Sequence, residues 1–204
     1  MRCLAGLTLF GIGIALIVDS ELGNGPWDVF HQGVADRLGV GIGTVIIATG
    51  AALMLLWIPL RVRPGIGTVL NAVQIGLVVD VMLPLLPEPR QIVLRVGYLA
   101  SGILLMGAAT ALYIGSGLGP GPRDGLMTGL AARGWKVRTA RTVIEVAVMV
   151  TGFALGGTVG IGTAVFALAI GPLVQWFLPR LSLDPVVRSD AAASSGTVIE
   201  SPAR

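Results

Sequence analysis

Long apolar stretches separated by short polar segments dominate this sequence. Six stretches consist almost entirely of aliphatic residues, alanine and glycine, and they cover residues 4–18, 40–60, 65–86, 96–114, 142–155 and 160–178. A helix needs roughly 20 apolar residues to cross the hydrocarbon core of a bilayer. The pattern therefore predicts an all-α polytopic membrane protein with six transmembrane helices, of which the first and fifth are short.

Two further segments, 24–39 and 120–136, have a helical pattern but carry several charges. The titratable residues that count against a transmembrane position are Asp28, His31, Asp36, Arg37, Arg123, Asp124, Arg133 and Lys136. Each charge placed in lipid costs a few kcal/mol. We therefore expect two short helices that lie at the membrane interface or are re-entrant. Trp27, Phe30 and a solvated His31 suit the outer interface, and the basic second segment suits the cytoplasmic one.

The chain contains an internal repeat. The pattern L-G-x-G-P-x-D occurs at residues 22–28 and again at 118–124, and G-I-G-T begins the third stretch at 65–68 and the sixth at 160–163. Gly76 and Gly171 occupy corresponding positions in this alignment. The repeat predicts two units of three spans each, residues 1–90 and 91–183. A disordered cytoplasmic tail is expected at 184–204.

The number of spans in each unit determines its orientation. Because three is odd, the second copy must enter the membrane from the opposite face. With a cytoplasmic amino terminus, most of the 14 lysine and arginine residues fall on the cytoplasmic side, as the positive-inside rule requires. The sequence thus predicts two inverted three-helix repeats, each with a short interfacial or re-entrant helix, and two cytoplasmic termini. Inverted repeats recur in secondary transporters, whose substrate site lies where the copies meet.

The G-P-x-D segments are the first candidates for substrate binding or translocation. Glycine at the N-cap, proline at the first helical position and aspartate near the positive end of the dipole describe a well-capped short helix, which is a sufficient structural explanation. Glycine-rich backbone at membrane depth is also tolerated where it lines a polar cavity. The residues concerned are Gly25, Pro26, Asp28, Gly121, Pro122 and Asp124.

Polar residues inside the predicted spans provide further candidates. Asn71, Gln74 and Asp80 share the third span, and an intramembrane carboxylate indicates a functional site by default. The alternative is a hydrogen bond or an ion pair within the bundle, for example with a threonine or a backbone group. Arg141 and Glu145 open the fifth span four residues apart, a spacing that predicts an interfacial ion pair on the helix surface.

Composition limits the remaining classes. The chain is 54% hydrophobic and 12% charged, whereas soluble domains carry about 25% charged residues. Cys3 is the single cysteine and His31 the single histidine, so neither a disulfide framework nor a zinc centre is expected. No nucleophile–base motif or phosphate-binding loop is present. We therefore expect no catalytic site, no metal or cofactor, and no nucleic-acid partner.

Four segments resemble a known family. L-G-N-G-P-W-D at 22–28, G-I-G-T at 41–44, L-W-I-P-L-R at 56–61 and R-P-G-I-G-T-V-L-N at 63–71 are similar to the YczE/YitT-like bacterial integral membrane proteins, with the YczE branch nearer. The resemblance extends over roughly residues 4–181. It implies a multi-span protein of the bacterial inner membrane and assigns no substrate.

Two functional hypotheses follow. The first is a secondary transporter or exporter of a small polar or ionic solute. The second is a membrane accessory or scaffold subunit of a biosynthetic or export complex. The expected partners are the lipid bilayer, the unidentified solute, and a second copy of the chain or another membrane protein.

Overall fold

The computed structural model describes residues 1–181, and every regular element in this part is a helix. The elements are α1 (Arg2–Ser20), α2 (Pro26–Leu38), α3 (Ile42–Leu60), α4 (Ile66–Met82), a 3-10 turn η1 (Leu83–Leu85), α5 (Ile92–Ile114), α6 (Pro122–Ala131), α7 (Val137–Ala154) and α8 (Ile161–Leu181). The tail predicted for 184–204 lies outside the described residues.

Five helices are long and apolar enough to cross a membrane: α1, α3, α4 with η1, α5 and α8. They coincide with five of the six predicted spans. The other predicted span, 142–155, lies in α7, which is 18 residues long and includes Arg138, Arg141 and Glu145. These three charges separate α7 from the apolar helices, so its assignment as a sixth span stays a prediction.

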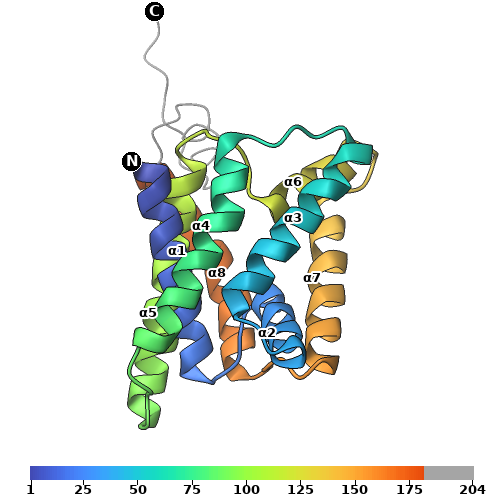
Figure 1. Ribbon diagram of the computed structural model, residues 1–204. Helices are drawn as coiled ribbons and strands as arrows, with labels where there is room; N and C mark the ends of the chain where they lie inside the picture. Colours follow the sequence, from blue (N-terminus) through green and yellow to red (C-terminus); the bar gives the residue numbers. More distant parts are fainter. Residues whose placement is uncertain (182–204) are drawn as a thin grey trace, which may run out of the picture.

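The long helices alternate in direction. In Figure 1, α1, α4 and α7 run downward, whereas α3, α5 and α8 run upward. The short helix α2 lies near the bottom and α6 near the top. The start of α1 meets the end of α8, where Arg2 Nη1 donates a hydrogen bond of 3.4 Å to the Leu181 carbonyl.

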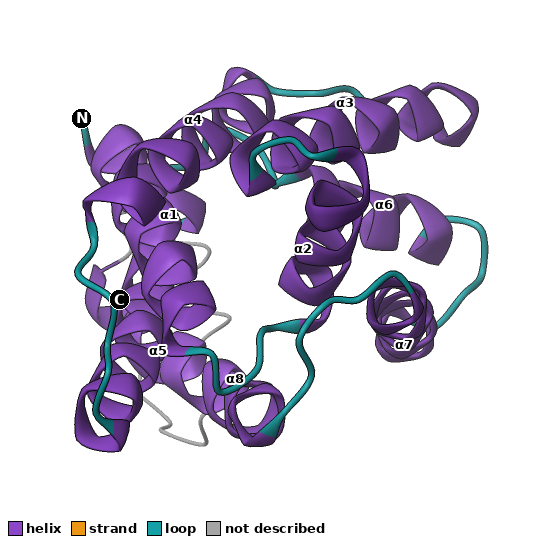
Figure 2. Cartoon of the chain, turned by 60° about the horizontal axis from the view of Figure 1, so that its bottom comes forward, coloured by secondary structure: helices purple, strands orange, loops and turns teal. Residues whose placement is uncertain are grey.

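The helices form two groups. In one, α1 packs against α4 and α5, and α5 packs against α8; in the other, α2 packs against α7, and α3 packs against α6. Contacts between α3 and α4 join the groups on one side, and Figure 2 shows the groups on opposite sides of the molecule's centre. Large apolar side chains on the outside of the long helices are exposed, as lipid contact requires.

Close approach of α1 and α5 builds the core of the first group. A Cβ at Gly13 would lie 2.9 Å from the Gly102 carbonyl oxygen, and one at Gly102 would lie 2.7 Å from the Gly13 oxygen. Small residues allow this kind of backbone contact between membrane helices. The buried apolar side chains around the crossing include Leu7, Ile14, Ile17, Ile75, Val79, Ile103 and Met106.

The short helices begin where the sequence predicts. Gly25 is the N-cap of α2 with Pro26 at its first position, and Gly121 and Pro122 do the same for α6. The expectation of a solvated His31 at an interface is wrong, because His31 is only 5% exposed. Helices α3 and α7 pack on α2 and cover the face that the sequence suggested would meet the interface.

Candidate functional site

The loop before each short helix has the same backbone conformation in both copies of the repeat. Gly23 has φ +112° and Gly119 has φ +115°, values that favour glycine. A Cβ at Gly23 would also lie 2.5 Å from the Gly160 nitrogen. Glycine is thus needed here both for conformation and for contact with the other copy.

These loops exchange hydrogen bonds between the copies. The Gly162 amide, at the start of α8, donates a 2.7 Å bond to the Leu22 carbonyl, and the Gly67 amide, at the start of α4, donates a 2.9 Å bond to the Leu118 carbonyl. The loop of each copy is therefore fixed by the G-I-G-T helix of the other. This reciprocal arrangement holds the starts of α2 and α6 in place between the two groups of helices.

A cavity of about 350 Å³ lies between the two groups. Gly25, Pro26 and Asp28 from α2 and its N-cap line it together with Asp124 from α6. The structure thus brings acidic residues of both G-P-x-D segments to one space, although they are 96 positions apart in the sequence. Their role in binding a solute stays a prediction.

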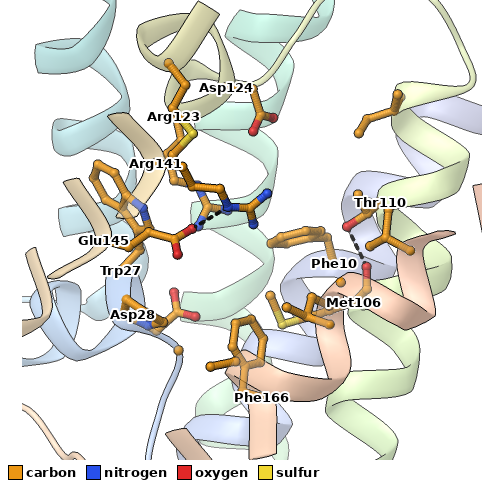
Figure 3. Close-up of a pocket in the computed structure, with 18 of the residues that line it drawn as sticks. Phe10, Trp27, Asp28, Met106, Thr110, Arg123, Asp124, Arg141, Glu145 and Phe166 are labelled. Atoms are coloured by element: carbon orange, nitrogen blue, oxygen red, sulfur yellow. Dashed lines mark hydrogen bonds and ion pairs between the residues drawn. The ribbon is translucent and has the colours of Figure 1, made fainter. Parts of the chain in front are cut away.

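The cavity has a charged side and an apolar side. Figure 3 shows the charged side chains, which come from α2, α6 and α7; they are Asp28, Arg123, Asp124, Arg141 and Glu145. Phe10 from α1, Met106 from α5 and Phe166 from α8 form much of the opposite wall. Such an amphipathic lining is typical of sites for small ligands, which combine apolar surface with a few placed polar groups.

Asp28 is the most deeply buried of these charges, with 3% of its surface exposed. Its Oδ1 has no hydrogen-bond partner within residues 1–181. His31 Nδ1 lies 3.4 Å from this oxygen but is not aligned for a hydrogen bond. Asp28 lines the cavity, and the His31 ring is the nearest partner of its buried Oδ1.

Arg123 follows the proline of the second motif. Its guanidinium carbon lies 5.8 Å from the ring centroids of both Phe10 and Trp27, within the range of a cation–π interaction. No carboxylate in the described part of the chain forms an ion pair with it. Its neighbour Asp124 is satisfied differently, because the Tyr113 hydroxyl donates a 2.8 Å hydrogen bond to Asp124 Oδ2.

Arg141 and Glu145 form the ion pair that their spacing predicts. Arg141 Nε donates to Glu145 Oε1 at 3.0 Å, with the side chains 57% and 31% exposed. The structure places the pair on the cavity wall, a location that the helix spacing alone did not indicate. These two charges neutralise each other.

A second, smaller cavity of about 30 Å³ shares Trp27, Asp28 and Arg123 with the first. Asn71 and Pro122 line it. Gly121 lies beside Asn71, since a Cβ there would be 3.4 Å from the Asn71 amide nitrogen. The predicted candidates Asn71 and Pro122 therefore line the smaller cavity, and Gly121 lies beside Asn71.

Asp80 and Gln74 lie away from both cavities. Asp80 Oδ1 accepts a 2.6 Å hydrogen bond from the Gly43 amide, and its Oδ2 accepts one of 3.1 Å from the Thr44 hydroxyl. Asp80 thus satisfies the amino-terminal end of α3, which is the structural alternative that the sequence left open. Gln74 Nε2 donates to the Leu4 carbonyl at 2.8 Å, which ties α4 to α1.

The two copies differ in how their second and third long helices pack. In the first copy, a Cβ at Gly76 would lie 2.4 Å from the Gly43 carbonyl oxygen, so α3 and α4 touch through backbone. In the second copy, a Cβ at the corresponding Gly171 would meet nothing within 4 Å, and α7 buries only Ala140 and Gly152. The α3–α4 side is closed, whereas the cavity-lining stretches of α7 and α8 are separated.

Several cavity residues escaped the sequence analysis as members of a site. The sequence assigns Arg123 to the basic segment at the cytoplasmic interface, and Phe10, Tyr113 and Phe166 fall within the apolar stretches. Arg123 lies between the proline and aspartate of the motif, and this adjacency was the available signal. The aromatic residues carry no signal in sequence, because their relation to the cavity depends on how α1, α5 and α8 pack.

Apolar helices surround this charged cavity, and the protein is a polytopic membrane protein. Comparison with known sequences agrees: the chain belongs to the family described as "Family of unknown function (DUF6198)", whose profile matches residues 1–179. The resemblance to YczE-like proteins is thereby confirmed.

Individual relatives cover most of the chain. An uncharacterized protein of Haemophilus influenzae is 43% identical over 176 residues, which cover 86% of this chain and 81% of the relative. The uncharacterized membrane protein YczE of Bacillus subtilis is 31% identical over 179 residues, covering 86% and 83%. The uncharacterized protein YyaS of Bacillus subtilis is 25% identical over 181 residues, covering 85% and 89%. No solved structure matches.

Proposed function

We propose that this protein is a secondary transporter of a small polar or ionic solute in the bacterial plasma membrane. In this proposal the chain crosses the membrane six times, in two inverted units of three spans each, residues 1–90 and 91–183. Both termini are cytoplasmic. The chain carries out no catalysis. The observation that carries the proposal is the meeting of both G-P-x-D segments at one charged cavity between membrane helices.

The alternating helix directions support the inverted arrangement. The three long helices of the first unit run down, up and down in Figure 1, and those of the second run up, down and up. The paired hydrogen bonds at Leu22 and Leu118 join equivalent atoms of the two units. In transporters built from inverted repeats, the substrate site lies at the interface between the repeats, where the cavity is found here.

The charges at the cavity support a transport role. An ionisable group in a membrane interior costs several kcal/mol, yet the buried Asp28 and the charged side chains of Arg123 and Asp124 lie together around a cavity of about 350 Å³. A solute that crosses the bilayer needs such groups in place of its water of hydration.

The packing difference between the units supports movement. If the units are structurally equivalent, the closed α3–α4 contact at Gly76 and the separated α7–α8 pair at Gly171 represent two states of one arrangement. Exchange of these states between the units would expose the cavity first to one side of the membrane and then to the other, as alternating access requires.

Accessibility from both faces of the membrane tests this proposal without knowledge of the solute. Thr110 lines the cavity, so Thr110→Cys is introduced together with Cys3→Ser, and membrane-impermeant thiol reagents are applied to right-side-out and to inside-out vesicles. We expect labelling from both faces. The wild-type chain, whose single cysteine Cys3 is buried, is the unreactive control.

The outcome separates the two functional classes. A transporter must open its cavity to each side in turn, so the introduced thiol reacts in both kinds of vesicle. An accessory or scaffold subunit has no such need. Labelling from only one face, or from neither, would refute transport and leave the accessory role as the better explanation.

A further inference from the structure

Two cavity side chains of opposite charge, Asp28 and Arg123, are less well satisfied than the others: Asp28 Oδ1 has the His31 ring 3.4 Å away but no aligned hydrogen bond, and Arg123 has no ion pair within residues 1–181. By contrast, Arg141 is paired with Glu145, and Asp124 accepts the Tyr113 hydroxyl. Because a charge without a close partner is costly away from water, a ligand that brings an opposite charge to Asp28 and to Arg123 would stabilise both.

We infer that the cavity binds a small zwitterion with an apolar body, of the class of free amino acids with an apolar or aromatic side chain. This inference rests on the proposed function, since it names the class of solute for the same site. The ammonium group of the ligand binds the Asp28 carboxylate, and its carboxylate binds the Arg123 guanidinium. Both are charge-assisted hydrogen bonds, which are about twice as strong as neutral ones.

Ligands with a single charge fit the cavity less well. A simple cation would satisfy Asp28 but add repulsion with the unpaired guanidinium of Arg123. A simple anion would satisfy Arg123 but lie in a cavity that also holds the carboxylates of Asp28, Asp124 and Glu145. A zwitterion pairs with both Asp28 and Arg123 and leaves the net charge of the site unchanged.

The apolar wall of the cavity determines which side chain the ligand carries. Phe10, Met106 and Phe166 present apolar surface opposite the charged side chains in Figure 3, so an apolar or aromatic side chain would pack there. The volume of about 350 Å³ is near the lower end of ligand pockets, which span roughly 300–1,000 Å³. The site therefore suits a single small molecule.

Three related probes test the charge requirement directly. The purified full-length protein is titrated in detergent with L-phenylalanine, with phenethylamine, which lacks the carboxylate, and with phenylpropionate, which lacks the ammonium group. Binding is measured as the rise in Tm that a ligand of the folded state produces. We expect phenylalanine to bind at least about tenfold more tightly than either analogue, the factor that corresponds to about 1.4 kcal/mol.

Substitutions assign each charge to its residue. Arg123→Gln should weaken phenylalanine binding about tenfold and abolish the preference over phenethylamine, while Arg123→Lys should restore part of it. Asp28→Asn should abolish the preference over phenylpropionate. The preference is a ratio measured within one variant, so it does not depend on that variant's own stability. The exposed residues Arg63 and Asp36 provide matched controls, and Arg63→Gln and Asp36→Asn should bind as the wild type does.

Each other result overturns the assignment. Equal stabilisation by phenethylamine would indicate a cation site, and equal stabilisation by phenylpropionate an anion site. Stabilisation by added phosphatidylethanolamine but not by phenylalanine would indicate a lipid headgroup instead of a free solute, and no stabilisation would mean that no such site exists. If phenylalanine binds but the thiol at position 110 reacts from one face only, transport is refuted and the ligand class stands. Labelling from both faces without binding refutes the ligand class alone.

Discussion

There is no room for a methyl group at Gly76, where α3 and α4 touch. At the corresponding Gly171 of α8, a methyl group would fit. A Cβ at Gly76 would lie 2.4 Å from the Gly43 carbonyl oxygen and 2.6 Å from Ile47 Cγ1. Because the backbone oxygen cannot rotate away, Gly76→Ala must push the helices apart. Overpacking of this kind costs typically ~1–3 kcal/mol, and alanine returns up to about 1 kcal/mol of helix propensity. With central values of about 2 kcal/mol for overpacking and about 1 kcal/mol for helix propensity, we expect a net loss of about 1 kcal/mol of stability.

Gly171→Ala is the matched substitution in the second copy. Its Cβ would meet nothing within 4 Å, so only the gain in helix propensity remains, up to about 1 kcal/mol. The two substitutions are chemically identical and occupy corresponding positions in the repeat. We therefore expect Gly76→Ala to lower the stability and Gly171→Ala to leave it unchanged or raise it.

Thermal unfolding of the purified variants measures this difference. For a chain of this size, 1 kcal/mol corresponds to a change in Tm of roughly 2–4 °C. The Tm of Gly76→Ala should thus fall by several degrees, while that of Gly171→Ala should stay constant or rise. An equal fall in both would show that α7 and α8 are packed as closely as α3 and α4, and the asymmetry between the copies would then be refuted.

Three further substitutions test individual contacts by the same measurement. Asp80→Asn weakens the charge-assisted hydrogen bond to the start of α3 and should cost ~1–3 kcal/mol without changing ligand preference; an unchanged Tm would contradict the capping role. Trp57→Phe removes the 3.1 Å hydrogen bond from Nε1 to the Pro122 carbonyl and, by leaving a buried acceptor unpaired, should also cost ~1–3 kcal/mol; a neutral effect would show that this carbonyl finds another donor. Glu145→Gln breaks a partly exposed pair with Arg141 and should change stability by less than ~1 kcal/mol; a larger loss would mean that the pair is shielded from solvent.

Local rules predicted the starts of the short helices correctly. Glycine at the N-cap and proline at the first position describe Gly25, Pro26 and their counterparts in α6 as the structure has them. Span boundaries were less accurate where charges extend a helix beyond the apolar run. The sequence placed the start of the fourth span at residue 96, but α5 begins at Ile92, and Arg95 within it forms an ion pair of 2.6 Å with Glu21.

The arrangement around the cavity could not be predicted in the same way. The repeat relates Asp28 to Asp124 in sequence, but their proximity to one cavity depends on the packing of α2 against α7 and of α3 against α6. His31 shows the same limit: a polar residue on a short helix suggests solvent, whereas in a membrane protein polar faces also turn inward. Asp80 was ambiguous because an intramembrane carboxylate serves equally well as a ligand or as a helix cap.

The exchange of hydrogen bonds between the two loops affects how the chain is made. The ribosome releases residues 1–90 to the insertion machinery first, but the loop at Leu22 finds its partner amide only at Gly162. The loop at Leu22 therefore stays incomplete until the start of α8 has been synthesised. Completion of the α2 start is then a late event, because α8 supplies the Gly162 amide only after α1, α3 and α4 are able to pack.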